Sequence, residues 1–598
     1  MGASRSRGYA PIRDYAAIGD GRTVALVARD GSVDWLCLPD LDSPSVLGAL
    51  VDAERGGRFA LEPEGPCEAT RRYLPETNVL ETTFATAAGT VRVTDAMTLP
   101  RGGLGPYREL VRRVDGLTGT VPLRWSLEPR FGYAGRTTRI ERRAGVPVAV
   151  SGRDAVALCA WDAGEPADGG DAIVGRFEAR EGRSSLLVLG AAHQEPLVLP
   201  SRDDAELRLH ETERSWREWA RDREYDGPWR EAVLRSALAL KLLVFAPSGA
   251  IAAAATTSLP EEIGGARNWD YRFSWPRDAS FALQALLALG CAPEARAFFS
   301  WMLHASRLTH PRLHVLYRLD GRAEAEEESL PLAGYRGSRP VRIGNGAAQQ
   351  VQLDVYGELL VAAARFASAT GGLDRDHARR LAEVADFVCE CWEQPDAGIW
   401  ESRGERAHFV QSKLMCAVGL RQACELAEGG LLPAGNRARW GREEQRIRDF
   451  VETRGWSERQ RAYVQRPGDE RLDASLLVAV LAGYDEPRAP RLLATVDAVR
   501  RELGRGPLIH RYLGDDGLPG EEGAFLACSF WLVEAYARQG RLDEAAALMD
   551  ELVPLANDVG LFAEEIDPAT GEFLGNFPQG LSHLALVNAA VSIEEARA

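Results

Sequence analysis

The sequence predicts a fold of two domains: an antiparallel β-sandwich over residues 1–201, then a helical linker over 202–226 and an (α/α)6 barrel over 227–598. The chain of 598 residues exceeds the size at which a single hydrophobic core stops growing, so we expect at least two domains. The spacing of the apolar residues also changes near residue 226, from a period of two to the period of a helix.

The first domain has the pattern of short, half-buried strands. Over residues 23–190, apolar and polar residues alternate in runs such as Leu123, Trp125 and Leu127, and Gly, Pro and Asp cluster between the runs. Short alternating runs with frequent turns are typical of an antiparallel sandwich. Residues 202–225 then carry many charges of both signs, which indicates a linker helix that lies across the domain boundary.

The second domain has the pattern of paired helices. Its first helix follows Asp226 and Pro228, which suit a helix cap and a first helical turn. Twelve helical segments begin near residues 227, 278, 293, 351, 376, 409, 436, 473, 488, 524, 541 and 579. Six helical hairpins can close into a ring of six inner helices surrounded by six outer ones. An open α-solenoid is the alternative, although solenoids stack units of more nearly equal length.

The composition is that of an ordinary globular protein, with 45% hydrophobic and 26% charged residues. The net charge of −16 argues against nucleic acid or an anionic membrane as a partner, because both attract basic surfaces. A small neutral ligand fits better. The apolar run over 237–255 is interrupted by Lys241, Pro247 and Gly249, so we expect a core helix there and no membrane span.

Cysteine usage and the N-terminal residues predict a cytoplasmic protein without a metal site. The nine cysteines are scattered and odd in number, so we expect reduced thiols rather than a disulfide framework. The N-terminus lacks the apolar core of a secretory signal. None of the nine histidines lies near a cysteine at the spacing of a zinc site.

The segment from Arg267 to Asp278 combines four aromatic residues, three arginines and two aspartates. Aromatic rings stack on the C–H faces of a sugar, and Arg and Asp side chains bond neighbouring hydroxyls in both directions. The pattern therefore indicates a sugar-binding site; the alternative is a surface loop with buried tryptophans and ordinary ion pairs. We expect residues 275–278 to contact the sugar, and Arg267 and Asp270 to be the scaffold that presents them.

Two further connections place glutamates beside apolar or aromatic neighbours, at Glu401 and at Glu564 with Glu565. Such surroundings raise the pKa of a carboxyl, and two opposed carboxyls flanking a sugar-sized pocket are what glycoside hydrolysis needs. The alternatives are a glutamate that stabilises a helix N-terminus and a solvated acidic pair. Because successive side chains of an extended segment point to opposite faces, at most one of Glu564 and Glu565 would face the pocket.

Two other loops carry candidate residues. Arg511 could bond sugar hydroxyls or pair with Asp515 and Asp516, which follow it closely. His583 enters the last predicted helix, where we expect a hydrogen-bonded core histidine.

Together these motifs resemble glycoside hydrolase family 15, the inverting glucoamylases, glucodextranases and trehalase-like enzymes. The motifs stand in the order of the family and span most of residues 227–598. They are Asn268-Trp-Asp-Tyr-Arg-Phe-Ser-Trp-Pro-Arg277-Asp278, Gly398-Ile-Trp-Glu401, Gln411-Ser-Lys413, and Ala563-Glu-Glu565-Ile-Asp567 followed by Gly575-Asn-Phe-Pro578. The motifs Ile18-Gly-Asp20 and Asp34-Trp35 resemble the β-sandwich domain of bacterial and archaeal members.

The resemblance implies roles for the glutamates. Glu401 is similar to the general acid that protonates the glycosidic oxygen. Glu564 is similar to the general base that activates water, and Glu565 is the substitute if the register is shifted by one. An inverting reaction of this kind needs no cofactor, and its carboxyls stand ~6.5 to 9.5 Å apart to leave room for the water.

The resemblance also implies a set of sugar-binding residues. Arg277 and Asp278 would clamp the hydroxyls of the terminal glucose, and Arg511 would be a second sugar-binding arginine. Trp275 and Trp400 would form the walls of the innermost subsite. Lys413, which follows the acid by a helical turn or more, would line the same pocket.

For the activity, the resemblance implies an exo-acting inverting hydrolase that releases β-glucose from soluble malto- or isomalto-oligosaccharides, as glucoamylases do. The alternative is a trehalase, although Pro276 departs from the leucine that trehalase-like members often carry. A phosphorylase is less favoured because a carboxylate at Glu564 would repel phosphate. An inactive sugar-binding homologue is less favoured because both carboxyls are present. A small carbohydrate is the expected partner. The sequence is compatible with a monomer and with a homo-oligomer.

Overall fold

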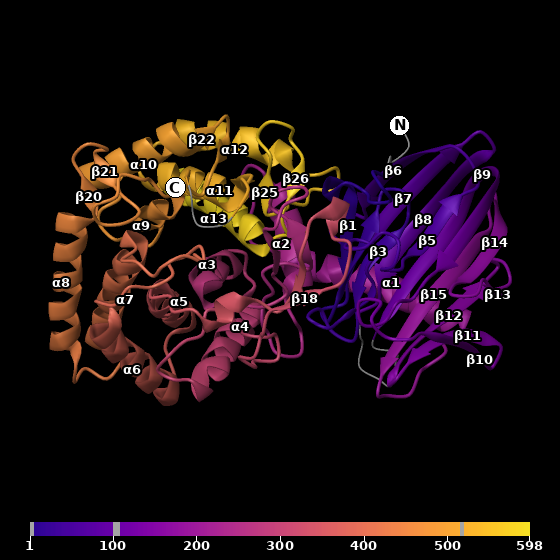
Figure 1. Cartoon of the computed structure of the whole chain (residues 1–598), viewed down its shortest axis with the longest axis horizontal. Coiled ribbons are helices and arrows are strands. Elements are labelled where there is room, and N and C mark those ends of the chain that lie inside the picture. Colours follow the sequence, from indigo (N-terminus) through magenta and orange to yellow (C-terminus); the bar gives the residue numbers. More distant parts are fainter. Residues whose placement is uncertain (1–4, 100–107, 515–518, 598) are drawn as a thin grey trace.

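The computed structural model describes residues 5–99, 108–514 and 519–597, and Figure 1 shows two parts side by side, a domain of strands and a domain of helices. The chain passes once from the first to the second. This arrangement confirms the predicted fold class of an N-terminal antiparallel β domain followed by a helical barrel.

The N-terminal domain is built around one long strand, β9 (Glu109–Leu127). The first half of β9 pairs with β8 and β15, and its second half pairs with β5 and β14, all antiparallel, so β9 belongs to both layers of strands. Leu123, Trp125 and Leu127 alternate along β9 and are buried, as their spacing predicts. The other strands are β1 (Tyr15–Gly19), β2 (Val24–Ala28), β3 (Val33–Cys37), β4 (Ser45–Leu47), β5 (Phe59–Pro63), β6 (Cys67–Tyr73), β7 (Leu80–Thr86), β8 (Gly89–Met97), β10 (Arg139–Arg143), β11 (Val146–Ser151), β12 (Asp154–Trp161), β13 (Ala167–Asp168), β14 (Ile173–Arg180) and β15 (Ser184–His193).

Helix α1 (Arg202–Arg221) connects the two domains. The Ser201 side chain caps it by accepting a hydrogen bond from the Asp204 N–H. Arg208 of α1 pairs with Glu109 of β9 at 2.6 Å, and the indole of Trp219, near the other end, donates to Glu294 of the barrel at 2.8 Å. The linker helix therefore contacts both domains.

The C-terminal domain is a closed double ring of helices. In sequence order, every second helix belongs to an inner ring in which α3, α5, α7, α9, α11 and α13 each contact the next, and α13 returns to α3. This closure shows that the open solenoid, the alternative from the sequence, is wrong. The helices are α2 (Arg230–Leu243), α3 (Ala279–Ala288), α4 (Ala292–Ala305), α5 (Asp354–Thr370), α6 (Arg375–Cys391), α7 (Val410–Glu428), α8 (Arg437–Arg454), α9 (Val478–Leu481), α10 (Pro490–Leu503), α11 (Leu526–Arg538), α12 (Leu542–Leu552) and α13 (Gly580–Arg597).

Burial separates the two rings. The inner helix α11 is buried on nearly all of its faces, whereas the outer helix α8 buries only Trp440, Ile447 and Val451. A helix that is apolar all round belongs inside, and one with a narrow apolar stripe belongs outside. The apolar pattern of each of these two helices thus agrees with its place in the inner or the outer ring.

Short hairpins stand in the connections between the helices. Their strands are β16 (Thr257–Pro260), β17 (Asn268–Asp270), β18 (Glu328–Leu330), β19 (Val341–Ile343), β20 (Trp456–Ser457), β21 (Ala462–Tyr463), β22 (Gly504–Arg505), β23 (Leu508–Ile509), β24 (Ala524–Phe525), β25 (Glu565–Ile566) and β26 (Phe573–Leu574). β16 pairs with β17, and β24, β25 and β26 form one small sheet. These two sheets carry several of the candidate site residues.

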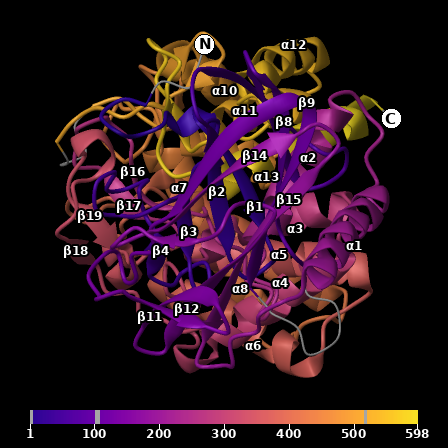
Figure 2. The ribbon, with the colours of Figure 1, turned by 90° about the vertical axis from the view of Figure 1, so that its right-hand side faces the viewer.

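The two domains share one continuous apolar core, and Figure 1 and Figure 2 together show the strands lying against the helical domain. Polar contacts cross the boundary as well. The Trp35 indole donates to the Ala255 carbonyl at 2.9 Å, and the Asn557 amide donates to the Tyr15 carbonyl at 2.8 Å. The N-terminal domain is therefore packed firmly on the barrel.

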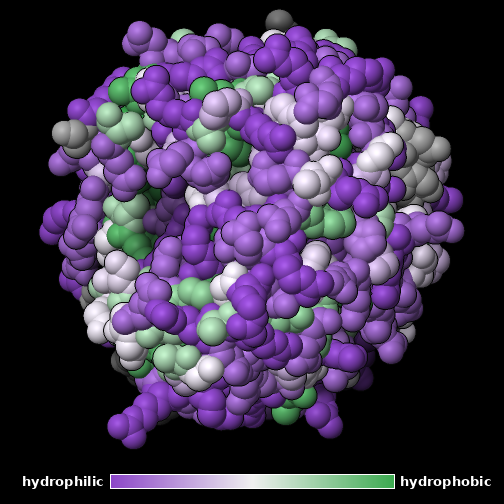
Figure 3. All heavy atoms as spheres, turned by 90° about the vertical axis from the view of Figure 1, so that its left-hand side faces the viewer, coloured by the Kyte–Doolittle hydropathy of each residue, from purple (hydrophilic) through white to green (hydrophobic). Residues whose placement is uncertain are grey.

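The outer face of the barrel, on the side away from the N-terminal domain, is mostly hydrophilic, with hydrophobic residues in small separate groups (Figure 3). Among the helices of the described residues, none combines the length and apolarity needed to cross a membrane. Each of the nine cysteines carries a free thiol.

Candidate active site

Loops that lead into the inner helices α3, α7 and α13 converge on one cavity, which we call the first pocket. Seven of the residues predicted from the sequence line it: Trp275, Arg277, Asp278, Trp400, Glu401, Arg511 and Glu564. Its other lining residues are Ala253, Tyr271, Phe525, Gln579 and Leu581. The motifs that lie far apart in the sequence thus meet in space.

A second pocket adjoins the first. Tyr271, Trp400, Glu401 and Arg511 line both pockets and so form their common boundary. The residues that line only the second pocket are Glu261, Arg267, Trp269, Asn345, Ser402, Arg403 and Tyr512. Of the two candidate catalytic carboxyls, Glu401 therefore stands at the junction of the pockets, and Glu564 lines the first pocket only.

Glu401 is held by an unusual turn before α7. Its φ of +49° lies in the left-handed region, which a side-chain-bearing residue adopts only when the surroundings impose it. Gly398, at φ +71°, begins the turn, and a Cβ there would lie 2.8 Å from the Phe409 ring. The Gln350 amide donates to the carbonyls of Glu401 and Ser402 at 3.1 Å each. The turn fixes the direction of the Glu401 side chain.

The Glu401 carboxyl is oriented through a single oxygen. Oε1 accepts hydrogen bonds from Arg277 Nη1 at 2.7 Å and from Trp275 Nε1 at 3.1 Å. Arg277 is fixed in turn by Asp278 at 2.9 Å and by the Ile399 carbonyl at 2.8 Å. No described residue makes a hydrogen bond to Oε2, so this oxygen is available to a substrate.

Glu564 has the surroundings of a base that works near neutral pH. It is buried, Oε2 accepts a hydrogen bond from the Asn576 N–H at 3.1 Å, and Oε1 has no partner among the described residues. Burial raises the pKa of Glu564 to about 7, against the lowering effects of Arg511 and the Tyr271 hydroxyl. The backbone of Gly575 packs directly on this side chain: a Cβ there would lie 2.6 Å from the Glu564 Cβ.

Glu565 faces away from the first pocket. It begins β25, and its Oε2 accepts a hydrogen bond from the Gly523 N–H at 2.9 Å. With Glu261 and Glu522 it surrounds the Arg511 guanidinium, whose Nη2 lies 3.1 Å from Glu261 and 3.5 Å from Glu565. Three carboxylates this close could hold a metal ion, but the arginine already places a cation among them. Of the adjacent glutamates, only Glu564 lines the pocket.

Trp400 separates the pockets as a rigid wall. Its indole N–H donates to Asp473 at 2.9 Å, its ring stacks with Trp531 at 6.0 Å, and the Arg511 guanidinium lies 5.5 Å from its centre. These contacts leave the ring little freedom, so its position between the two pockets is fixed.

Lys413 does not belong to the site, which corrects the prediction. It is fully buried on α7, and its ammonium donates to the carbonyls of Trp392 at 2.6 Å and Gln394 at 2.5 Å. Its role is to satisfy carbonyls behind the pocket. His583 is a core histidine, as expected: one ring nitrogen lies 2.9 Å from Ser236 Oγ, and burial lowers its pKa to about 3.

The structure also bears on two arginines, and it changes the expectation for one of them. Arg267 was expected to be scaffold, but it lines the second pocket and bonds Glu522 at 3.0 Å. Arg511 lines both pockets and pairs with glutamates, as described above; Asp515 and Asp516, the alternative partners that the sequence offered, lie outside the described residues.

Sequence reasoning missed several lining residues, of which Tyr271 and Trp269 could have been found. They alternate along and just after β17, so they share one face, while Asp270 and Arg272 share the other. The Trp269 ring is itself flanked by guanidinium groups, Arg342 at 4.5 Å and Arg403 at 4.7 Å from its centre. Asn345 and Gln579 come from other loops, and their spacing in the sequence gives no comparable signal.

Known proteins match the chain over nearly its whole length. The model of Glycosyl hydrolases family 15 matches residues 227–591, and that described as Trehalase-like, N-terminal, matches residues 6–162. A trehalase of Mycolicibacterium smegmatis is 39% identical over 98% of this chain and 91% of its own, and a trehalase of Thermoplasma volcanium is 34% identical over 98% and 94%.

The structural comparison agrees at the level of the fold. A bacterial glucoamylase solved in complex with acarbose superposes with a TM-score of 0.72 over 99% of this chain and 96% of its own, at 13% identity. The family model covers the barrel that carries both carboxyls, and the relatives span both domains. The chain therefore belongs to glycosyl hydrolases family 15 and is a glycoside hydrolase.

Proposed function

We propose that this chain is a trehalase, which hydrolyses the bond between the two glucose units of trehalose with inversion at one of them. The relatives that are at least a third identical over nearly the whole chain carry the name trehalase. The glucoamylase-type activity, the first expectation from the sequence, has weaker support, because the solved glucoamylase shares only 13% identity and so supports the fold alone.

The observation that carries the proposal is the position of the two carboxyls relative to the two pockets. Glu401 lies where the pockets meet, and Glu564 lines the first pocket only. A disaccharide with one ring in each pocket would place its bridging oxygen at Glu401 and the far side of its first ring toward Glu564. This is the arrangement that an inverting hydrolase needs.

In this mechanism Glu401 is the general acid and Glu564 is the general base. Glu564 takes a proton from a water, the water attacks the anomeric carbon of the sugar in the first pocket, and Glu401 gives a proton to the departing oxygen. Arg277 and Asp278 bind hydroxyls of that sugar, and Trp275 and Trp400 wall it. A pKa of Glu564 of about 7 gives a base matched to neutral pH.

The charges of the pockets fit a neutral substrate. Arg511 is paired with Glu261 and Glu522, and Arg267 is also bonded to Glu522. Arg403, at the edge of the second pocket, is paired with Glu327 at 2.8 Å. Each pocket arginine thus has a carboxylate partner, and none needs an anionic group on the sugar. These paired side chains still offer hydrogen bonds to hydroxyls.

The test is to incubate the purified chain with trehalose, maltose, isomaltose and longer maltodextrins and to follow the anomeric protons by NMR. We expect trehalose to have the highest kcat/KM. Its first products should be α- and β-glucose in equal amounts, because one unit departs unchanged and the other is inverted.

Three outcomes would contradict parts of the proposal. Initial release of α-glucose alone would exclude inversion. Faster hydrolysis of maltodextrins than of trehalose would restore the glucoamylase-type activity. A requirement for phosphate, with a sugar phosphate as product, would indicate a phosphorylase. The Glu564→Gln variant, prepared in parallel, controls for contaminating hydrolases.

A further inference from the structure

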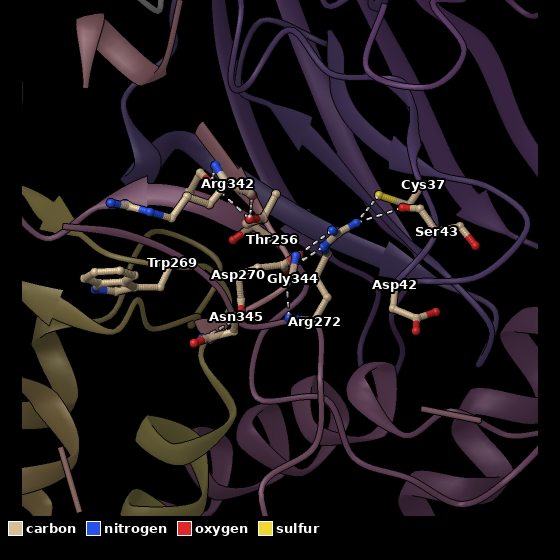
Figure 4. A network of polar contacts seen from close by, with 12 residues as sticks. Cys37, Asp42, Ser43, Thr256, Trp269, Asp270, Arg272, Arg342, Gly344 and Asn345 are labelled. Carbon is tan, nitrogen blue, oxygen red and sulfur yellow. Dashed lines mark hydrogen bonds and ion pairs between the residues drawn. The ribbon is translucent and has the colours of Figure 1, made fainter. Parts of the chain in front are cut away.

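The segment from Trp269 to Arg272 faces two ways. Trp269 and Tyr271 line the pockets, whereas Asp270 and Arg272 point to the opposite side and are 0% and 1% exposed. In Figure 4, Trp269 lies on one side of Asp270, and Arg272 reaches away on the other side toward Cys37 and Ser43 of the N-terminal domain. One short segment thus connects the sugar site to the domain boundary.

The Arg272 side chain makes four hydrogen bonds at this boundary, the longest of them from Nη1 to Cys37 Sγ at 3.5 Å. Its Nε and Nη2 donate to the two oxygens of Asp270 at 2.8 and 2.6 Å, and its Nη1 donates to the Ser43 carbonyl at 2.7 Å. The rings of Trp35 and Tyr133, also of the N-terminal domain, lie 5.9 and 5.8 Å from the guanidinium. Because the planar guanidinium is bonded to Asp270 on one side and to Ser43 on the other, it fixes the distance and the orientation of the segment relative to the N-terminal domain.

Asp270 extends the connection to another loop of the second pocket. Its Oδ2 accepts a hydrogen bond from the Gly344 N–H at 3.1 Å, and its carbonyl accepts one from the Asn345 amide at 3.3 Å. Asn345 lines the second pocket beside Trp269. Ser43, the ion pair and two pocket-lining segments therefore form one connected network, of which the ion pair is buried.

We infer that Arg272 is a positioning residue through which the N-terminal domain sets the place of Tyr271 and Trp269 in the two sugar pockets. Tyr271 contacts the Trp275 ring edge-on at 5.4 Å and lowers the pKa of Glu564. Trp269 lines the second pocket. A shift of the segment should therefore change both the ionisation of the base and the binding of the second sugar.

The pH response depends on every charged or titratable group near Glu564. These groups are Tyr271, Arg511, Glu522, Glu261 and Glu565, together with Glu401, Arg277 and Asp278, which line the same pocket. Tyr271 is carried by the Arg272 network directly, whereas Arg511 and the four glutamates come from other loops. Loss of the Tyr271 effect alone would raise the pKa of Glu564 and move the acidic limb of the kcat/KM profile to higher pH.

The variant Arg272→Lys tests the inference. Lysine keeps a positive charge beside Asp270, which avoids an unpaired buried charge, but it cannot bind two carboxylate oxygens and the Ser43 carbonyl in one plane. We expect a folded protein whose kcat/KM for trehalose falls about tenfold to a hundredfold, because misplacement of about 1 Å has effects of this size. We also expect a higher KM and a displaced acidic limb.

Arg71→Lys is the matched control. Arg71 binds Asp558 across the same domain boundary with an equally bidentate geometry, at 2.9 and 2.7 Å, but it lines neither pocket. We expect it to lower the melting temperature while leaving KM and the pH profile unchanged. Equal effects of the two variants on KM and on the pH profile would mean that domain contact in general, and not Arg272, matters.

The outcome can be separated from the proposed function, on which the choice of substrate rests. If the unaltered chain hydrolyses another sugar of the panel and not trehalose, that sugar is used and only the proposed function fails. If the unaltered chain is active and folded Arg272→Lys keeps its KM and pH profile, the positioning role is wrong. Should Arg272→Lys not fold, the double variant Asp270→Asn with Arg272→Met, which buries no charge, is measured by the same criteria.

Discussion

At the scale of single residues, Glu564 and Glu565 are neighbours with opposite surroundings. Glu564 lines the first pocket, whereas Glu565 bonds the Gly523 N–H and faces Arg511. Loss of a general base costs on the order of 10²- to 10⁴-fold in rate. We therefore expect Glu564→Gln to reduce kcat by this factor and Glu565→Gln to reduce it far less. Steady-state measurement of kcat for both variants tests this expectation. A larger loss of kcat in Glu565→Gln than in Glu564→Gln would assign the base to Glu565.

The variant Glu401→Gln tests the proposed general acid in the same way. Glutamine keeps an acceptor for Arg277 and Trp275, which bind Oε1 at 2.7 and 3.1 Å, but it cannot give up a proton to the departing sugar. We expect a folded protein, with unchanged far-UV circular dichroism and a loss of kcat on the order of 10²- to 10⁴-fold. Near-normal activity of both Glu401→Gln and Glu564→Gln would contradict the assignment of the two carboxyls.

The raised pKa of Glu564 also predicts how stability depends on pH. In the folded protein the pKa is about 7, against an ordinary value of 4.5, so the folded state binds this proton more tightly than the unfolded state does. The stabilisation is fully present below about pH 4.5 and is lost as pH rises through about 7. Above that pH the buried charge of Glu564 destabilises the parent.

Glu564→Gln should therefore be more stable than the parent at pH 8 and nearly as stable as the parent at pH 5. Urea unfolding at the two pH values measures this difference. Glu572→Gln, an exposed position in the neighbouring hairpin, is the control and should show no such dependence on pH. Equal differences at both pH values would mean that Glu564 is not buried as a titrating group.

The residues that sequence patterns identified are those whose chemistry is visible in the motif itself. Arg277, Asp278 and Glu401 stand beside tryptophans in short motifs, and each lines the first pocket. Lys413 was misassigned because its spacing from Glu401 places it on α7 but does not say which carbonyls its ammonium meets. The roles assigned to these residues stay predictions until variants are measured.

At the scale of elements, the hairpin of β25 and β26 is followed by a glycine that packs against Glu564, the proposed base. Gly575 follows β26, has a φ of +69°, and leaves no space for a Cβ beside Glu564. An alanine there would meet both the strain of a left-handed backbone and a contact of 2.6 Å. We expect Gly575→Ala to reduce kcat at least tenfold, since small displacements of a catalytic group have large effects.

Gly571 provides the control within the same hairpin. Its φ is +74°, but a Cβ built there meets nothing within 4 Å. Gly571→Ala therefore introduces the backbone strain without the clash, and we expect it to lower stability by about 1 kcal/mol with kcat unchanged. If both alanines reduced kcat alike, the strain rather than the contact with Glu564 would be the cause.

The elements themselves were largely predictable. The expected helix starts near residues 351, 376, 409 and 436 correspond to α5, α6, α7 and α8, which begin at Asp354, Arg375, Val410 and Arg437. Helical periodicity is a strong signal because each helix buries one face. The hairpins between the helices escaped prediction, since strands of two to four residues are too short to show a period.

At the scale of the whole molecule, the closed ring explains why distant motifs meet. Loops that lead into the inner helices α3, α7, α11 and α13 open toward the same cavity, so Glu401 before α7 and Glu564 before α13 line one pocket although 163 positions (564 − 401) separate them. Sequence spacing cannot show this, because the closure depends on contact between α13 and α3. The predicted domain boundaries at 201 and 226 and the cytoplasmic location stay predictions.

Because the two domains are packed firmly on each other, we expect the whole molecule to unfold as one unit. The apolar core is continuous from one domain to the other, and hydrogen bonds cross the boundary, among them Asn78 Nδ2 to the Leu238 carbonyl at 3.0 Å and Arg235 Nη1 to the Thr77 carbonyl at 2.9 Å. A domain whose partner has unfolded would expose this core and leave these buried groups without partners, which costs about 1–3 kcal/mol per group. Calorimetry should therefore show a single transition whose calorimetric and van't Hoff enthalpies agree. Two separate transitions, or loss of the β signal before the helical one in circular dichroism, would show instead that the barrel is stable alone and that the N-terminal domain is only attached to it.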